Sequence, residues 1–291
     1  ESIAIACAQI LNNCPMNRNS APLLQMNPIL EHNRRAWDER TRNGKRFTQP
    51  ATEADFDDPM KIMDGPGWLG DVCDKHVLCL GAGGGRHGPL LASLGAHVTV
   101  VDISPAMLER DRDVAAARGL QVNTVEASID DLSALHDAEY EIVIQPVSTC
   151  YVPDIRRVYR EVARVTRAGA IYSSRHKQPA SLQVGLVPVP AGFIIGEPYY
   201  LNGPLPPPQQ EGPHREQGTI EFLHRWGDLL GGLCQSGFVL EDVLEPKFGD
   251  PTDQPGTFKY RGHYIPPYIQ FMARRTDAVV KSEVEVWTPN V

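Results

Sequence analysis

The sequence predicts an α/β fold built on a doubly wound, mostly parallel sheet, and three observations support this prediction. Short apolar runs alternate with helical stretches from His76 to Ser174, which is typical of parallel βαβ units whose crossovers cover both sheet faces. A glycine-rich turn at residues 81–85 follows the first apolar run, where such folds bind nucleotides. The chain has 291 residues, 42% of them apolar, so it can bury a large core without disulfides or a structural metal.

The hydrophobic pattern predicts the individual strands and helices along the chain. Strands are expected at residues 76–80, 97–101, 121–125, 140–144, 170–174, 238–244 and 268–273. Helices are expected at residues 29–40, 88–93, 105–118, 155–166 and 219–235, and a loop at 245–263.

Two segments outside this alternation define the domain organisation. Residues 1–27 show no sustained period, and after the helix expected at 29–40 a polar, acidic stretch leads to the Gly-Pro-Gly turn at 65–67. We interpret residues 1–65 as an N-terminal extension and cap on a main domain at 66–291. Residues 177–218 contain nine prolines, which exclude a long helix. A segment of this length inside a domain is usually functional, so we expect a Pro-rich lid insert at about 177–218.

Composition narrows the classes of partner. The net charge of −8 disfavours broad nucleic-acid binding, which needs a positive field, and the basic run at residues 34–46 is interpreted as a solvated helix face and loop. No stretch reaches the length of a membrane span. The cysteines at 7, 14, 73, 79, 150 and 234 form no C-x-x-C pair, which favours a reducing compartment and no metal site. We therefore expect a cytoplasmic protein that binds neither nucleic acid nor a membrane. The sequence does not predict its oligomeric state.

The strongest functional signal is the segment VLCLGAGGGR at residues 77–86. Glycines at 81, 83 and 85 let the backbone approach a ligand closely. Asp102 ends the next strand and is expected beside this turn, where its carboxylate can accept hydrogen bonds from both ribose hydroxyls of an adenosine. Residues 83–88 also match the dinucleotide-binding pattern G-x-G-x-x-G. The glycine turn alone therefore also allows the interpretation that the protein is an NAD-dependent dehydrogenase.

Further motifs follow the glycine turn in order. They are LGAGGGR at 80–86, VDISPAML at 101–108, VEASIDDL at 125–132, YEIVI at 140–144 and EVARVTRAG at 161–169. With them the chain resembles the class I S-adenosylmethionine-dependent methyltransferases from about Trp68 to Arg275. The resemblance implies a seven-stranded sheet with an antiparallel last strand, S-adenosyl-L-methionine as cofactor, and methyl transfer as the activity.

The resemblance also implies a cofactor site. The matching positions are Gly81, Ala82, Gly83, Gly85, Asp102, Ile103, Met107, Ser128, Ile129, Gln145 and Pro146. The glycine turn would wall the methionine part, Asp102 would hold the ribose, and Gln145 with Pro146 would close the site below the sulfonium. Many members carry acidic residues at the positions of Cys79 and Ser128, so this chain's cofactor geometry or affinity is expected to differ.

The carboxyl ends of the later strands and the insert supply candidates for the acceptor site. Methyl transfer from a sulfonium is an in-line displacement, so the protein mainly positions the nucleophile, and a base is needed only if the nucleophile arrives protonated. The catalytic candidates are His176, Tyr151 and His224, and the substrate-binding candidates are Trp37, Arg175, Tyr199, Tyr200, Arg225, Tyr260, Arg261 and His263. The arginines suggest a substrate that carries a carboxylate. The alternative interpretation is that the arginines are ordinary surface charges and that His176 is a structural, hydrogen-bonded histidine.

The predicted function is S-adenosylmethionine-dependent methyl transfer to a small-molecule nucleophile in an enclosed pocket. Two alternatives stay open: an NAD-dependent oxidoreductase, and a non-catalytic nucleotide-binding protein of the same fold. The sequence leaves the methyl acceptor and the methylated atom unidentified.

Overall fold

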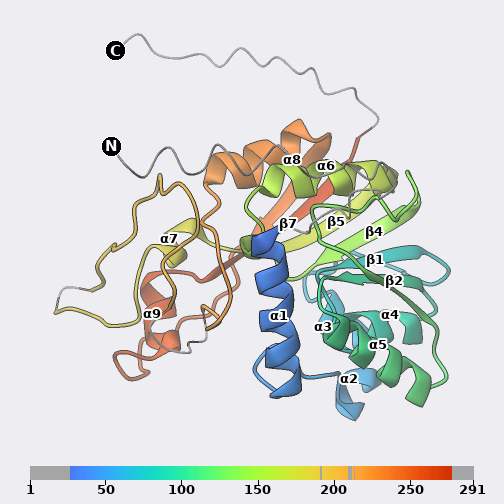
Figure 1. Cartoon of the computed structure of the whole chain (residues 1–291), viewed down its shortest axis with the longest axis horizontal. Helices are drawn as coiled ribbons and strands as arrows, with labels where there is room; N and C mark the ends of the chain where they lie inside the picture. The colour runs from blue at the N-terminus through green and yellow to red at the C-terminus, as the bar shows by residue number, and fades with distance from the viewer. Residues whose placement is uncertain (1–26, 191, 209–211, 213, 277–291) are drawn as a thin grey trace, which may run out of the picture.

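A seven-stranded sheet organises the computed structural model, which describes residues 27–276 apart from 191, 209–211 and 213 (Figure 1). The strand order is β3-β2-β1-β4-β5-β7-β6. The strands are β1 (His76–Leu80), β2 (His97–Asp102), β3 (Val122–Glu126), β4 (Tyr140–Gln145), β5 (Thr166–Lys177), β6 (Phe238–Leu244) and β7 (Tyr268–Arg275). Strands β1 to β5 pair in parallel, and β7 runs antiparallel to both β5 and β6. The predicted doubly wound sheet with an antiparallel last strand is confirmed.

Helices cover both faces of this sheet, and each face has its own hydrophobic core (Figure 1). The helices are α1 (Pro28–Arg42), α2 (Glu53–Asp57), α3 (Pro59–Met63), α4 (His87–Ser93), α5 (Pro105–Ala117), α6 (Ile155–Val165), α7 (Pro179–Leu182), α8 (Gly232–Gln235) and α9 (Phe258–Tyr264), with a short 3-10 helix η1 (Thr149–Tyr151) and a π-helix η2 (Gly227–Gly231) that leads into α8. In β1, Leu78 and Leu80 enter the core under α6 and α8, whereas Val77 and Cys79 enter the core on the opposite face. This alternation follows from the two-residue period of a strand.

Helix α1 is fixed against the start of α5 by a buried carboxylate. It begins at Pro28, where Asn27 caps the helix by accepting the Ile29 N–H at 3.0 Å. Further along, Asp38 Oδ1 accepts the Ser104 hydroxyl at 2.7 Å and the Ala106 N–H at 3.2 Å. The cap helix is therefore attached to the main domain beside the end of β2. Residues 1–26 of the expected extension, with Cys7 and Cys14, lie outside the described residues, and the boundary at residue 65 stays a prediction.

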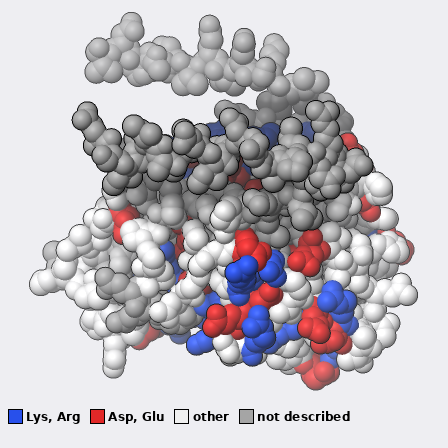
Figure 2. Space-filling model, in the orientation of Figure 1, with Lys and Arg blue, Asp and Glu red and all other residues white. Residues whose placement is uncertain are grey.

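The basic run of α1 does not form a positive patch on the face shown in Figure 2, where acidic and basic side chains intermix. Glu31 pairs with both Arg34 and Arg35 at 2.8 and 2.6 Å, and Arg34 also approaches Asp38 at 3.2 Å. The interpretation of Arg34 and Arg35 as a solvated helix face agrees with these contacts.

The second half of the chain departs from three sequence expectations. The helix expected at 219–235 begins only at Gly227, because the segment before it pairs with distant backbone: Phe222 forms an antiparallel bridge with Pro204, and its N–H donates to the Cys150 carbonyl at 2.7 Å. The loop expected at 245–263 contains α9, which Thr257 caps by accepting the Tyr260 N–H. Strand β5 continues to Lys177 because β7 pairs with it through that residue.

The Pro-rich insert is held by α9 rather than lying free over the sheet. Arg261 of α9 is fully buried and donates to the carbonyls of Val184 and Gly185, each at 3.0 Å, and to the Ser181 hydroxyl at 3.1 Å. Within the insert, Leu182 packs against Leu205 and other apolar residues. Across the residues that the structure describes, no helix combines the length and apolar character needed to cross a membrane.

Candidate active site

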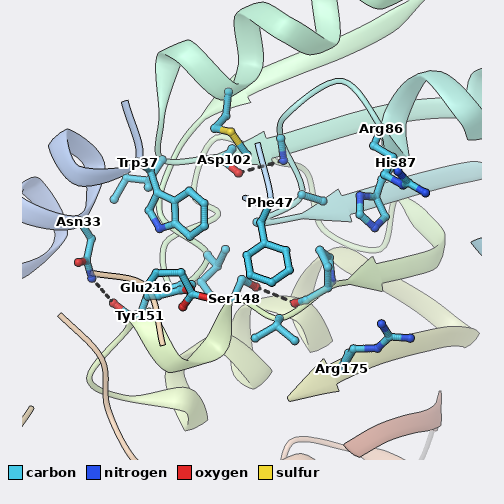
Figure 3. Close-up of a pocket in the computed structure, with 18 of the residues that line it drawn as sticks. Asn33, Trp37, Phe47, Arg86, His87, Asp102, Ser148, Tyr151, Arg175 and Glu216 are labelled. Carbon is cyan, nitrogen blue, oxygen red and sulfur yellow. Dashed lines mark hydrogen bonds between the residues drawn. The ribbon is translucent and has the colours of Figure 1, made fainter. Parts of the chain in front are cut away.

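A cavity of about 590 Å³ lies at the carboxyl ends of β1, β2, β4 and β5, the edge where doubly wound sheets bind ligands (Figure 3). Its walls come from α1, the segment 46–49, the loops after the first four strands, the end of β5 and the last part of the insert. The lining residues with polar or aromatic side chains are Asn33, Trp37, Arg46, Phe47, Gln49, Arg86, His87, Asp102, Ser128, Ser148, Tyr151, Arg175, Lys177, Glu216, Phe248 and Tyr268.

The turn after β1 needs glycine because its backbone lies directly against neighbouring side chains. Gly81 has φ +59°, and a Cβ there would lie 2.7 Å from the Ser148 side chain. At Gly83 a Cβ would lie 2.8 Å from Met107 Cβ and 3.0 Å from Asp102 Oδ2. These contacts leave the backbone of residues 81–83 as one wall of the cavity. Gly85 packs instead against the Arg110 carbonyl and does not line the cavity.

Asp102 lies beside this turn at the end of β2. Its Oδ2 accepts the Gly83 N–H at 2.9 Å, and its Oδ1 accepts the Ser104 N–H at 2.9 Å. Burial raises the pKa of Asp102 to about 6, although the hydrogen bonds from Ser104 and Gly83 oppose this shift. Each carboxylate oxygen has a further lone pair, so an ionised Asp102 is suited to accept two hydroxyl donors from the cavity.

Most positions of the expected cofactor site lie together around Asp102. Those that line the cavity are Gly81, Ala82, Gly83, Asp102, Ile103, Met107, Ser128, Ile129 and Pro146. Gln145 does not, because its amide is buried, donating to Ser148 Oγ at 2.9 Å and accepting the Tyr172 hydroxyl. Of the two departures from the family pattern, Ser128 lines the cavity and donates to Asp130, whereas Cys79 is buried in the core below.

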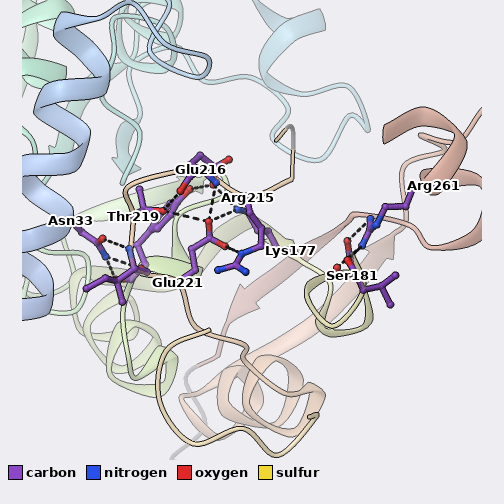
Figure 4. A network of polar contacts seen from close by, with 11 residues as sticks. Asn33, Lys177, Ser181, Arg215, Glu216, Thr219, Glu221 and Arg261 are labelled. Atoms are coloured by element: carbon purple, nitrogen blue, oxygen red, sulfur yellow. Dashed lines mark hydrogen bonds and ion pairs between the residues drawn. The ribbon is translucent and has the colours of Figure 1, made fainter. Parts of the chain in front are cut away.

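A second polar group lies at the other end of the cavity, where the insert rejoins the sheet (Figure 4). Glu216 Oε2 accepts the Tyr151 hydroxyl and a Lys177 N–H, both at 2.6 Å. Glu221 extends the group, since Lys177 Nζ lies 3.3 Å from its Oε1 and Arg215 Nε lies 3.0 Å from its Oε2. We call these five residues the Glu216 cluster; Tyr151, Lys177 and Glu216 line the cavity.

The pKa shifts in the Glu216 cluster favour an ion pair beside a neutral phenol. Burial raises the pKa of Tyr151 well above its usual value, and the Glu216 charge raises it further, so the phenol keeps its proton. Burial would lower the pKa of Lys177, but Glu216 and Glu221 outweigh burial and raise it. Burial would raise the pKa of Glu216, but Lys177 outweighs burial and lowers it.

Two of the three catalytic candidates lie outside the cavity. Arg175 and Lys177 line it, but His176 between them points to the opposite face, as strand alternation requires. The His176 ring is 2.9 Å from both Thr149 Oγ1 and Ser174 Oγ, and burial lowers its pKa to about 3. His224 is also buried and donates to the Thr149 carbonyl at 2.9 Å. The structure thus leaves Tyr151 as the cavity-lining candidate.

The expected substrate residues divide in the same way. Trp37 and Arg175 line the cavity, and the Trp37 ring meets the Tyr151 ring edge-on at 5.4 Å. The remaining candidates have other contacts or face solvent. Tyr200 and His263 are exposed, and the Tyr199 hydroxyl accepts the Trp226 N–H. Arg225 forms an ion pair with Asp228, the Tyr260 hydroxyl is hydrogen-bonded to the Tyr264 hydroxyl, and Arg261 holds the insert.

Several lining residues were not predicted from the sequence. Arg46 ends the basic run interpreted as solvated, and Phe47 follows it directly. Glu216 lies in the irregular insert, where no hydrophobic period indicates which way a side chain points. Arg86 and His87 follow the glycine turn directly, and that position was the available signal for them.

Comparison with known proteins adds a family-level finding. The methyltransferase domain family matches residues 78–173. The chain is 32% identical over 247 residues to the uncharacterized methyltransferase YbaJ of Bacillus subtilis (strain 168), covering 79% of this chain and 95% of that protein. It is 28% identical over 175 residues to a ubiquinone biosynthesis O-methyltransferase of Xanthomonas euvesicatoria pv. vesicatoria, covering 60% and 66% respectively. A solved S-adenosylmethionine-dependent methyltransferase from Mesorhizobium loti shares the fold at a TM-score of 0.60 and 23% identity, over 76% of this chain and 100% of that one.

Proposed function

Because the chain belongs to the class I S-adenosylmethionine-dependent methyltransferases, we propose that it methylates a small-molecule nucleophile held in the cavity beside the Glu216 cluster. One observation carries this proposal: Asp102 with its glycine turn and three members of the Glu216 cluster (Tyr151, Lys177 and Glu216) line the same cavity of about 590 Å³. Family membership also excludes the NAD-dependent oxidoreductase that the glycine pattern alone could not distinguish from a methyltransferase.

The residues around Asp102 fit the cofactor of this family. Asp102 would accept hydrogen bonds from the ribose hydroxyls, Ile103 and Met107 would pack against the adenine, and the backbone of residues 81–83 would lie along the methionine part. The fit rests on a carboxylate with free acceptor capacity beside a backbone wall that packs too closely against Ser148 and Met107 to carry a Cβ at Gly81 or Gly83. S-adenosyl-L-methionine supplies, when bound, a methyl group activated by a positively charged sulfur.

The Glu216 cluster is suited to hold and deprotonate the acceptor. The Tyr151 hydroxyl donates to Glu216 and keeps lone pairs that can accept a proton from the acceptor, and Trp37 is an apolar wall beside it. Glu216 is the ionised carboxylate of the cluster, kept so by Lys177. A nucleophile that arrives protonated would pass its proton to Glu216, directly or through the Tyr151 hydroxyl, 2.6 Å away.

A calorimetric titration with S-adenosylhomocysteine tests the cofactor half of this proposal. Wild-type protein is expected to bind, and Asp102→Ala to bind roughly 10- to 100-fold more weakly, because charged hydrogen bonds contribute about 1.5–3 kcal/mol. Asp113→Ala is the matched control, since Asp113 is exposed on α5. A wild-type protein that ignores both S-adenosylmethionine and S-adenosylhomocysteine at millimolar concentration contradicts the proposal.

A further inference from the structure

The charges that line the cavity do not balance. Its cations are Arg46, Arg86, Arg175 and Lys177, and its carboxylates are Asp102 and Glu216. Lys177 pairs with Glu216, and Arg86 lies 3.4 Å from Asp55 outside the cavity. Asp102 is engaged by backbone N–H groups. Two guanidinium groups, Arg46 and Arg175, are left facing the cavity without a carboxylate among the described residues.

Arg175 is placed by the strand that carries it. It lies two residues before Lys177 on β5, so both side chains project to the cavity side of the sheet. Its protein contact is with the Gln270 amide, whose oxygen, in the orientation that satisfies both groups, accepts Arg175 Nε at 2.6 Å. Arg175 remains exposed where it lines the cavity, so its guanidinium is accessible to an anion that enters. The surrounding protein lowers the pKa of Arg175, and an anion beside it would stabilise the charged form. Arg167, on the same strand outside the cavity, is paired with Glu141 at 3.5 Å.

Arg46 and His87 complete this end of the cavity. The Arg46 guanidinium lies 4.9 Å from the Phe47 ring, and both Arg46 and Arg175 are close enough to Tyr268 to interact with it electrostatically. Burial, together with the charges of Arg86 and Arg175, lowers the pKa of His87 to about 4. Figure 3 shows His87, Arg86 and Arg175 at the end of the cavity away from Asn33 and Tyr151. We call Arg46, His87 and Arg175 the basic corner.

We propose that the basic corner binds an anionic group, carboxylate or phosphate, of the methyl acceptor, with Arg175 as its principal ligand. The inference rests on the proposed function and narrows its substrate class. Guanidinium groups bind both anions through paired N–H donors. In the sheet order, β5 is three strands from β2, and at about 4.8 Å between strands this separates Arg175 from the Asp102 strand by roughly 14 Å. That separation assigns the corner to the acceptor and not to the ribose.

The test uses protein saturated with S-adenosylhomocysteine, so that the cofactor's own carboxylate is already bound. Benzoate, phenyl phosphate and the neutral isostere benzamide are titrated calorimetrically into wild type, Arg175→Gln and Arg167→Gln. We expect at least one of the two anions to bind wild type about tenfold or more tightly than benzamide, and the benzoate and phenyl phosphate arms show which anion fits. The preference should disappear in Arg175→Gln and persist in Arg167→Gln.

Two results would overturn the inference. One is equal binding of benzamide and both anions to wild type. The other is a fall in S-adenosylhomocysteine affinity in Arg175→Gln, which would assign the arginine to the cofactor's carboxylate. We expect the affinity of this variant for S-adenosylhomocysteine to stay within about twofold of wild type. Retained binding also shows that the variant is folded. Failure of the proposed function is seen separately, as absence of S-adenosylhomocysteine binding to wild type, and it removes both proposals.

Discussion

Individual side chains at the strand ends divide between chemistry and core according to their direction. At β5, Arg175 and Lys177 line the cavity while His176 is buried among Tyr159 and Phe271. A residue type suited to catalysis is therefore not sufficient, because a one-residue shift along a strand changes the face. Asp102 differs from His176 in combining a suitable direction with a pKa near neutrality.

Asp102 predicts a pH dependence of cofactor binding. Its ionised form accepts hydroxyl donors, so we expect S-adenosylhomocysteine affinity to fall as the pH is lowered from 7.5 to 5, with a midpoint near the pKa of about 6. Calorimetry across this range measures the effect. Asp102→Asn cannot titrate and should flatten the profile. An unchanged profile in this variant would instead point to Asp111, whose pKa burial raises to about 7.

The same shift has a defined sign for stability without cofactor. Since the folded pKa of about 6 lies above the ordinary value of 3.8, the folded protein keeps a proton that the unfolded chain has lost. The contribution of Asp102 to the free energy of unfolding therefore decreases as the pH rises through that window, and is constant above it.

At the scale of elements, α1 is part of the site and is fastened on two sides. Asp38 fixes it to the start of α5. Asn33 fixes it to η1 and to the segment that follows the insert, donating to the carbonyls of Tyr151 at 2.9 Å and Ile220 at 3.0 Å and accepting the Ile220 N–H at 2.8 Å. These contacts place Trp37 over the cavity.

Removing the Asn33 side chain should destabilise the protein and loosen this wall. Asn33→Ala leaves buried carbonyl and N–H groups unpaired, which costs about 1–3 kcal/mol, and the weakened attachment of α1 should also lower S-adenosylhomocysteine affinity. Urea unfolding and calorimetry measure the two effects. Asn123→Ala is the control, because Asn123 is exposed on β3. Equal unfolding midpoints for the two variants would show that Asn33 does not secure α1.

The elements that the sequence predicted well are those with a local signal. The βαβ alternation and the glycine turn located β1 to β4 and Asp102, because apolar period and glycine spacing are written in neighbouring residues. Glu216 and Arg46 carry no such signal, since their positions depend on contacts with residues far along the chain, such as Lys177. The helix expected at 219–235 was wrong in its first half for the same reason: long-range backbone partners of Phe222 outweighed local propensity.

At the scale of the whole molecule, the Glu216 cluster connects the sheet to the insert through buried charge. Lys177 belongs to β5, whereas Arg215 and Glu216 lie at the end of the insert and Glu221 follows it. The cations and carboxylates compensate one another while all are present. A buried network of this kind adds little stability by itself but is costly to break.

Lys177→Met should lower the free energy of unfolding by about 3–5 kcal/mol, because it leaves Glu216 and Glu221 without their shared cation. Adding Glu216→Gln should recover part of that loss, and a double-mutant cycle in urea measures the coupling. Arg167→Met, at an exposed ion pair on β5, should cost no more than about 1 kcal/mol. Additive effects of the Lys177 and Glu216 changes would contradict a coupled network.

The cavity walls come from two parts of the chain that differ in how strongly packing constrains their sequence. Asp102 and the glycine turn belong to the sheet and are constrained by backbone packing, while Trp37, Arg46 and Glu216 stand on α1, the segment after it, and the end of the insert. Mutation can remodel these outer segments without disturbing the strands that support the adenosine end. The architecture thus allows new acceptors to be acquired by evolution while the methyl donor stays the same.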